Sequence, residues 1–317
     1  MTRLRAAVVQ AETPSDLTDG LSRTAGLVRD AAAKGAELVA FPEAWLSGYP
    51  AWLDHCRDAA LWDHPPVKRV YARMVDNSVA VPGDASAALA QIARDSGVTL
   101  VVGVSERVEV GPGRGTLYNA VLTYGPDGAL LNHHRKLLAT YSERMVWGHG
   151  DAFGLRAVPT RAGKRNVRIG ALICWEHWMP LARQALHESG EDVHVALWPT
   201  VHEMHQVASR QYAFEGRCYV LAAGSLMRAA ALPAELEPHP GKVSGGDQWL
   251  LRGGSAIIGP DGAYLADPVY DTATTIMADL DLGRLAEERL TLDVTGHYAR
   301  PDVFEFRVVS RERPRPV

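Results

Sequence analysis

The chain has 317 residues, a hydrophobic content of 47% and a formal net charge of −4 at pH 7. It is long enough to bury a large core, and its slightly acidic balance argues against a nucleic-acid-binding protein. The three cysteines, Cys56, Cys174 and Cys218, are odd in number and widely spaced. This pattern argues against a disulfide scaffold and favours a reducing cytoplasm.

The N-terminal segment is typical of a first strand and not of a signal peptide. Residues 1–10 carry two arginines followed by only a few apolar residues. No apolar run in the chain approaches the ~20 residues that a membrane helix needs. We therefore expect a soluble, cytoplasmic protein that does not associate with membranes.

Strands and helices alternate in the first third of the chain. Residues 6–10 predict a buried strand, and the apolar residues that follow recur three or four positions apart, as on one face of a helix. Ser15 is the expected cap of this helix and Gly35 its end. A strand is predicted next, over 37–41. A helix follows over 84–92, capped by Asp84 and closed by Gly97, and then another strand over 98–104.

Two hairpins are predicted in the rest of the chain. The sequence Gly-Pro-Asp-Gly occurs at 125–128 and again at 259–262, and each copy predicts a tight turn between two strands. Between the hairpins, Pro180 opens a helix that Gly190 closes. The remaining elements predicted there are strands at 167–173 and 193–197 and a helix at 202–216.

Two stretches, 48–82 and 227–253, break the alternation. The first is rich in aromatic residues with helical character, and the second is a Gly- and Pro-rich segment that reads as a long loop. Loops of that length in a compact domain are usually functional or lie at an interface. The overall alternation predicts an α/β layered sandwich. Because no linker divides the chain, we expect a single domain over 1–317, with a short C-terminal tail from about residue 303.

Three chemically useful side chains are expected at strand ends. Cys174 follows the apolar run 169–173, Glu43 follows 38–42, and Lys136 follows the strand that begins at Leu130. Ligands of α/β sheets collect at the carboxyl ends of strands. The helix that follows Cys174 is expected to favour its thiolate form.

Each of the three also has an ordinary interpretation. Cysteines at strand ends are often small buried hydrophobes, Glu43 could be a solvated loop acid, and Lys136 could end a basic surface patch. If Cys174 is a nucleophile, it needs a base, and the usual base is histidine. The spacing of the histidines does not exclude a Cys–His hydrolase.

Three segments of the chain resemble motifs of the nitrilase superfamily and occur in the family's order. They are Phe41–Glu43, His134–Leu137 and Gly170–Glu176. The resemblance implies a Glu–Lys–Cys triad of Glu43, Lys136 and Cys174, with Glu143 as a fourth catalytic residue. It extends from Val8 to Asp302. It also implies a four-layer α-β-β-α sandwich that dimerises through helices, or assembles into a higher homo-oligomer.

The branch of the superfamily is indicated by the residues after the cysteine. Cys174–His177, with Pro180–Arg183 beyond it, is similar to nitrilases and cyanide-degrading relatives, and 143–151 and 296–302 agree. The resemblance implies hydrolysis of an organic nitrile to a carboxylic acid and ammonia. The sequence departs from the family's motif at Leu138–Thr140, where the family often has Pro-Thr. Because this loop borders the expected pocket, the difference bears on substrate preference. The alternatives are a cyanide-degrading enzyme, an aliphatic amidase or a non-catalytic binding protein on this fold.

The expected substrate pocket is aromatic. Tyr49, Trp52, Trp175 and Trp198 lie near strand ends and suit an apolar nitrile, and His177 is a further candidate; ordinary packing is the alternative for each. The reaction needs no metal or cofactor. The two histidines within 202–205 lack the spacing of a zinc motif, and the glycine-rich segment 111–115 lacks the lysine and helix of a phosphate-binding loop.

Overall fold

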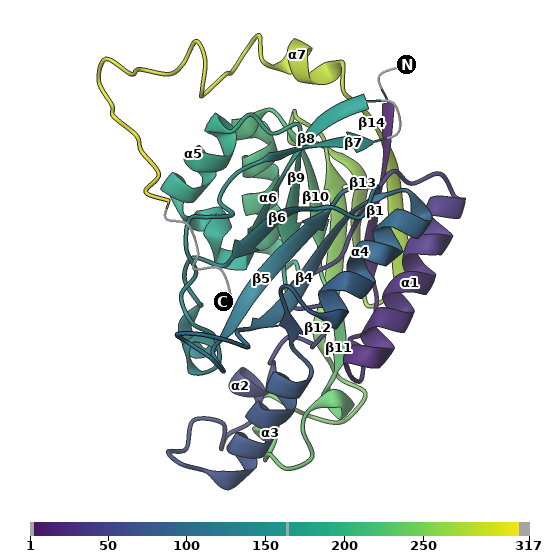
Figure 1. The fold of residues 1–317 in the computed structure, drawn as a ribbon, viewed down its shortest axis with the longest axis vertical. Coiled ribbons are helices and arrows are strands. Elements are labelled where there is room, and N and C mark those ends of the chain that lie inside the picture. The colour runs from purple at the N-terminus through teal and green to yellow at the C-terminus, as the bar shows by residue number, and fades with distance from the viewer. Residues whose placement is uncertain (1–2, 163–164, 311–317) are drawn as a thin grey trace.

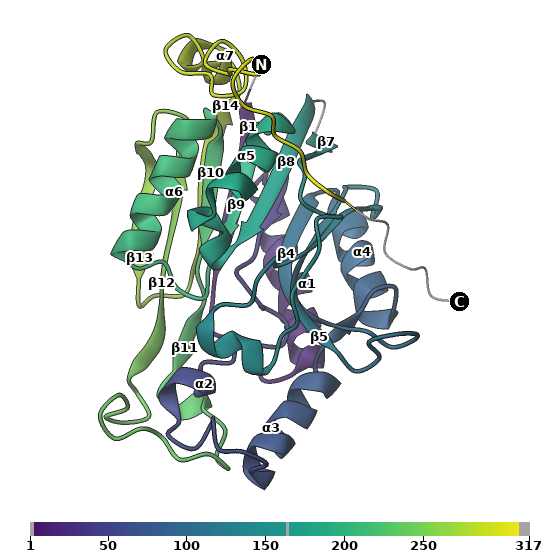
Figure 2. The same ribbon diagram turned by 90° about the vertical axis from the view of Figure 1, so that its left-hand side faces the viewer.

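Two mixed seven-stranded sheets pack face to face in the computed structural model, which describes residues 3–162 and 165–310 (Figures 1 and 2). The first sheet has the strand order β14-β1-β2-β4-β5-β6, with β3 beside β4. Its strands are β1 (Arg3–Gln10), β2 (Leu38–Ala40), β3 (Val79–Ala80), β4 (Thr99–Arg107), β5 (Leu117–Tyr124), β6 (Leu130–Arg135) and β14 (Thr274–Asp281).

The second sheet has the order β11-β12-β10-β9-β8-β7, with β13 beside β12. Strands β8, β9 and β10 run parallel, so their carboxyl ends meet at one edge. The strands of this sheet are β7 (Val158–Ala162), β8 (Arg165–Ile173), β9 (Val193–Leu197), β10 (Tyr219–Ala223), β11 (Leu226–Arg228), β12 (Trp249–Ile258) and β13 (Tyr264–Tyr270).

Helices cover the outer face of each sheet, which confirms the expected α-β-β-α order of layers (Figure 1). In β1, Ala6 and Val8 join the core that includes the second sheet, while Ala7 and Val9 pack on the helical side, as the alternation of strand side chains requires. The helices on the first sheet are α1 (Leu17–Ala33) and α4 (Asp84–Ser96), and those on the second are α5 (Pro180–Glu188) and α6 (Glu203–Gly216).

The helix ends differ slightly from the sequence-based expectation. Asp16, and not Ser15, caps α1, because its side chain accepts a hydrogen bond from the backbone N–H of Asp19 at 2.9 Å. Asp84 is the first residue of α4, after the cap residue Gly83. Gly97 closes α4 with a φ of +64°, a left-handed conformation that glycine adopts readily.

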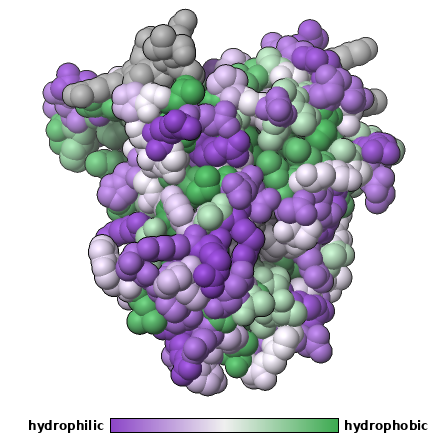
Figure 3. Space-filling view, turned by 60° about the horizontal axis from the view of Figure 1, so that its bottom comes forward, coloured by the Kyte–Doolittle hydropathy of each residue, from purple (hydrophilic) through white to green (hydrophobic). Residues whose placement is uncertain are grey.

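The two irregular stretches are structured and pack on each other at the lower end of the molecule in Figure 1. The first stretch forms α2 (Trp52–His55), α3 (Pro65–Asp76) and β3, and the second forms β11, the 3₁₀ turn η3 (Ala229–Ala231) and the start of β12. A shared apolar cluster joins them, and Cys56 pairs with Pro238 in an isolated bridge. The face that they present mixes hydrophobic with hydrophilic residues (Figure 3). We call these two stretches the paired inserts.

Outside the two irregular stretches, four helices and strands were not expected from the sequence. They are β7, β10, β14 and α7 (Arg284–Glu288). β14 pairs with β1 along its whole length, from Arg3 opposite Asp281 to Gln10 opposite Thr274. As an edge strand whose side chains are mostly half-exposed, β14 lacks the clear apolar alternation by which strands are recognised. Among the described residues, no helix is long and apolar enough to cross a membrane.

Candidate active site

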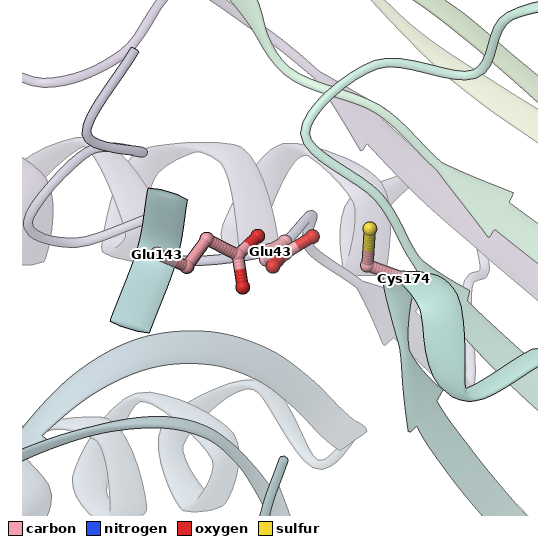
Figure 4. Close-up of side chains that lie close together, drawn as sticks. All are labelled: Glu43, Glu143 and Cys174. Atoms are coloured by element: carbon pink, nitrogen blue, oxygen red, sulfur yellow. The ribbon is translucent and has the colours of Figure 1, made fainter. Parts of the chain in front are cut away.

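The residues predicted at strand ends meet where the two sheets pack. Glu43 follows β2 and Lys136 follows β6 in the first sheet, while Cys174 follows β8 in the second. Glu143 comes from η1 (Tyr141–Met145), a 3₁₀ turn. One carboxylate oxygen each of Glu43 and Glu143 and the sulfur of Cys174 all lie within 4.8 Å of one another (Figure 4). All four residues are buried.

Lys136 lies between the two carboxylates. Its Nζ is 3.2 Å from Oε1 of Glu43 and 2.7 Å from Oε2 of Glu143. Burial alone would lower the pKa of Lys136, but the neighbouring Glu43, Cys174 and Glu143 raise it above its ordinary value. The ammonium group therefore stays charged between the two carboxylates.

Only one of the two carboxylate oxygens of Glu43 accepts hydrogen bonds from the described residues. Its Oε1 accepts hydrogen bonds from Lys136 and from Nδ2 of Asn119, the latter at 2.6 Å, whereas its buried Oε2 accepts none from the residues that the structure describes. Asn119 was not predicted from the sequence. The available signal was a polar residue inside the apolar run of β5, where an unpaired amide would be costly.

Burial sets the protonation of the acid and the thiol. It raises the pKa of Glu43 to about 7, with Lys136 acting in the opposite direction. It also raises the pKa of Cys174 well above the ordinary range, reinforced by the nearby charge of Glu43. The expectation that a helix lowers the pKa of Cys174 is therefore wrong: burial and the charges of Glu43 and Glu143 outweigh the lowering effects of Lys136 and of the backbone N–H of Trp175, which begins the short 3₁₀ turn η2 (Cys174–Trp178) with Cys174.

The backbone around these residues is tightly constrained. Cys174 has a φ of +52° and Ala44, next to Glu43, a φ of +49°, a conformation that costs non-glycine residues of order 1–3 kcal/mol and clusters at active sites. The backbone N–H of Trp175 points to the sulfur of Cys174. Gly103 on β4 lets the acid approach, since a Cβ there would lie 2.8 Å from the Cα of Glu43.

A cavity of about 370 Å³ opens onto Cys174. Both Tyr49 and Trp175 line it, as expected, and Trp175 is 55% exposed. Tyr49 also donates a hydrogen bond from its hydroxyl to Oε1 of Glu143 at 3.0 Å. The paired inserts contribute further lining residues, namely Ala51, Asp54, His55, Leu250 and Leu251.

A family model for carbon–nitrogen hydrolases matches residues 5–289. The chain belongs to the carbon–nitrogen hydrolase family. It is 38% identical to an aliphatic nitrilase of Sinorhizobium fredii (strain HH103), covering 99% of this chain and 98% of the relative. It is 41% identical to nitrilase 2 of an unknown prokaryotic organism, covering 92% of this chain and 88% of that relative.

The fold is also that of solved members of the family. The crystal structure of Saccharomyces cerevisiae Nit3, a member of branch 10 of the nitrilase superfamily, matches with a TM-score of 0.68. The match covers 94% of this chain and 97% of that one, at 19% sequence identity. The likeness shows that the chain has the fold of this solved structure.

Three residues expected at the pocket of this carbon–nitrogen hydrolase lie elsewhere. Trp52, His177 and Trp198 are at most 5% exposed and do not line the cavity, contrary to the sequence-based expectation. Trp52 packs in the apolar cluster of the paired inserts. Trp198 stacks on His177 at a ring distance of 4.6 Å and donates to Ser209. All three side chains are packed inside the protein. A position near a strand end did not reveal this, because burial depends on tertiary contacts.

The placement of His177 weakens the alternative of a Cys–His hydrolase. Its Nδ1 lies 2.7 Å from the backbone carbonyl oxygen of Cys174, and its Nε2 lies 3.0 Å from Nε2 of His194. Both ring nitrogens are thus engaged away from the thiol. Burial and neighbouring His194 also hold the pKa of His177 well below its ordinary value, so it stays neutral.

A larger cavity, of about 470 Å³, lies at the other end of the second sheet. Its lining includes Arg168, Glu191, Asp192 and Arg217, which lie near the amino-terminal ends of β8, β9 and β10. Cys174 follows the carboxyl end of β8, which is where α/β folds place their ligands. The smaller cavity at Cys174 is therefore the candidate active site.

Proposed function

We propose that this carbon–nitrogen hydrolase is a nitrilase, which converts an organic nitrile and two waters into a carboxylic acid and ammonia. The observation that carries the proposal is the buried group of Cys174, Glu43, Lys136 and Glu143, which opens onto an otherwise mainly apolar cavity. The nitrilase names of relatives that match over nearly the whole chain support the same activity.

The first half of the reaction forms a covalent thioimidate. Glu43, whose pKa is about 7, takes the proton of Cys174 as the sulfur attacks the nitrile carbon, and passes that proton to the nitrile nitrogen. Coupling the two events removes the need for a resting thiolate. The ammonium of Lys136 and the backbone N–H of Trp175 stabilise negative charge as it develops.

The second half releases the products. Glu43 activates a water that adds to the thioimidate carbon, and the resulting tetrahedral species expels ammonia to leave a thioester on Cys174. A second water, activated in the same way, displaces the sulfur and yields the acid. Glu143 holds Lys136 in place, since their charged groups are 2.7 Å apart.

The proposal is tested by measuring ammonia release from aliphatic, aromatic and arylacetic nitriles, cyanide and matched amides. Cys174→Ala is compared with Cys218→Ala, which alters a buried thiol outside the site. Turnover of nitriles that only Cys174→Ala abolishes is the expected result. Turnover of amides alone or of cyanide alone would replace nitrile hydrolysis with that activity, and no turnover at all would favour a binding protein.

We also propose that the protein forms a homodimer through α5 and α6. These helices leave large apolar side chains in solvent: Leu181 is 70%, Met204 59% and Phe214 44% exposed. Pairing of this helical layer would bury them. Light scattering coupled to size-exclusion chromatography should give a dimeric mass that Leu181→Glu reduces to a monomer, whereas an unchanged mass would place the interface elsewhere.

The three free, buried cysteines are consistent with our proposal of a cytoplasmic location.

A further inference from the structure

Glu176 connects the backbone beside the nucleophile to the backbone beside the lysine. Its Oε1 accepts a hydrogen bond from the N–H of Leu137, the residue after Lys136, at 2.8 Å. Its Oε2 accepts one from the N–H of Ile173, the residue before Cys174, also at 2.8 Å. The carboxylate therefore bridges two positions that are 36 apart in the chain (173 − 137): Leu137 follows β6 of the first sheet, and Ile173 ends β8 of the second.

His134 completes the bridge. Its Nε2 lies 3.0 Å from both carboxylate oxygens of Glu176, and neither side chain has any exposed surface. Burial acts to raise the pKa of Glu176, but His134 and the two backbone N–H groups outweigh it and hold the pKa below its ordinary value. The side chain is thus an ionised acceptor with all of its hydrogen bonds inside the protein.

We propose that Glu176 is a positioning residue, which fixes Cys174 and Lys136 relative to each other across the junction of the two sheets. It is placed beside the reacting atoms and not among them: the sulfur of Cys174 lies within 4.8 Å of a carboxylate oxygen of Glu43 and of Glu143, whereas the hydrogen bonds of the Glu176 carboxylate within the described residues go to flanking backbone N–H groups and to His134. This proposal rests on the proposed function only in taking Cys174 as the nucleophile and Lys136 as its charge partner.

The bridge matters because the attacking sulfur and the stabilising ammonium come from separate sheets. Small displacements of one against the other change the geometry in which a thiol is activated, and a 1 Å misplacement can cost about 10²-fold in rate. The left-handed backbone at Cys174 also has to be maintained by its surroundings. Glu176 supplies such a restraint at the residue immediately before it.

Glu176→Gln tests the proposal with little change in shape. A carboxylate accepts on both oxygens, whereas the amide has one acceptor and one donor. The NH₂ group must therefore face either Leu137 N–H or Ile173 N–H, and one half of the bridge is lost. We expect kcat for the best nitrile to fall about 10²-fold with KM little changed, and iodoacetamide to alkylate Cys174 more slowly, as followed by peptide mass spectrometry.

Two further variants make the result specific. Glu106→Gln is the matched control, because Glu106 is also a buried carboxylate paired with a histidine, His133 at 2.7 Å, and its other partner among the described residues is the guanidinium of Arg135 and not a backbone N–H group. It should lower Tm without changing kcat or the alkylation rate. His134→Gln removes the histidine but leaves both backbone hydrogen bonds, so it should retain more activity than Glu176→Gln.

Several outcomes would overturn the proposal. One is a folded Glu176→Gln protein with wild-type kcat and a wild-type alkylation rate, which would make the role purely structural. Another is an equal loss in His134→Gln, which would make the buried ion pair the important feature. If Glu176→Gln does not fold, the rate at which iodoacetamide alkylates Cys174 in His134→Gln tests the proposal instead. A wild-type rate supports the role of the two backbone hydrogen bonds, and a rate about 10²-fold lower contradicts it. Since alkylation requires no substrate, this comparison stands even if the wild-type protein hydrolyses no nitrile.

Discussion

Nζ of Lys136 lies 3.2 Å from Oε1 of Glu43, and both side chains are almost completely buried. The ammonium group offsets part of the cost of ionising a carboxyl group in this environment, and burial supplies the larger, opposite effect on the pKa of Glu43. The result is a carboxyl group that is close to half-ionised at neutral pH. Such a group can take and return a proton in one catalytic cycle.

The activity should therefore rise with pH through about 7, because only the ionised form of Glu43 accepts the proton of Cys174. Below this pKa, kcat/KM should fall about tenfold per pH unit as Glu43 becomes protonated. Glu43→Gln should lower kcat by about 10²–10⁴-fold. Ammonia release between pH 5 and 9 measures both effects; a Glu43→Gln enzyme that keeps the same rise would assign the titration to another group.

The hydrogen bonds to Glu143 predict that Tyr49→Phe reduces kcat much less than Glu143→Gln does. Glu143 binds Lys136, Tyr49 and the backbone N–H of Thr140. Tyr49→Phe removes one donor and should lower the free energy of unfolding by about 1 kcal/mol with a small effect on kcat. Glu143→Gln removes the charge that holds Lys136 and should reduce kcat about 10²-fold. Urea unfolding and steady-state kinetics on the two variants would reveal any reversal of this order.

A methyl group at position 103 should displace the catalytic acid. The added Cβ of Gly103→Ala would lie 2.3 Å from the carbonyl oxygen of Pro42 and 2.8 Å from the Cα of Glu43. We expect kcat to fall about 10²-fold and the stability to decrease by about 1–3 kcal/mol. Gly26→Ala is the control, since Gly26 lies within α1 and, apart from its chain neighbours and the nearby helix backbone, no described atom lies within 4 Å of the added Cβ.

The control variant should be stabilised by about 0.5–1 kcal/mol with unchanged kcat, because alanine is the better helix former. Thermal unfolding and nitrile turnover measure both variants. Equal activity of the two proteins would show that the close approach at Gly103 does not position Glu43.

Two tryptophans should behave differently despite their common place near strand ends. Trp175 is 55% exposed and lines the cavity, so Trp175→Ala should change the ranking of nitriles by kcat/KM with little loss of stability. Trp198 is fully buried, so Trp198→Ala should cost about 3–5 kcal/mol. A nitrile panel with thermal unfolding separates the cases; an unchanged ranking in Trp175→Ala would remove it from the substrate site.

The sequence was most informative where the signal is local. Local patterns identify the strand ends that Glu43, Lys136 and Cys174 follow, and motif resemblance assigns these three residues and Glu143 to one site, so the four residues that meet in the structure could be named in advance. The partners of these residues depend on tertiary contacts. Asn119 lies on β5 and reaches Glu43 only because β5 pairs with β4, and Trp198 is buried by α6, which no local pattern indicates.

The protonation of the thiol shows the same limit. A strand end followed by a helix predicts a lowered pKa for Cys174, but the pKa is raised by burial between the sheets and by Glu43. Similarly, the paired inserts look like two unrelated loops in the sequence, since their contacts join residues about 180 positions apart, such as Cys56 and Pro238. Packing of this kind is decided by the whole fold.

The division of the catalytic groups between two sheets has a consequence for biosynthesis. Glu43, Lys136 and Glu143 precede the second sheet in the chain, and Cys174 emerges only with β8. A nascent or partly denatured chain therefore has an ordinary, unactivated cysteine, and the reactive centre exists only after the halves have docked. Enzymatic turnover thus reports on the last stage of assembly, and its recovery during refolding should lag behind the formation of either sheet alone.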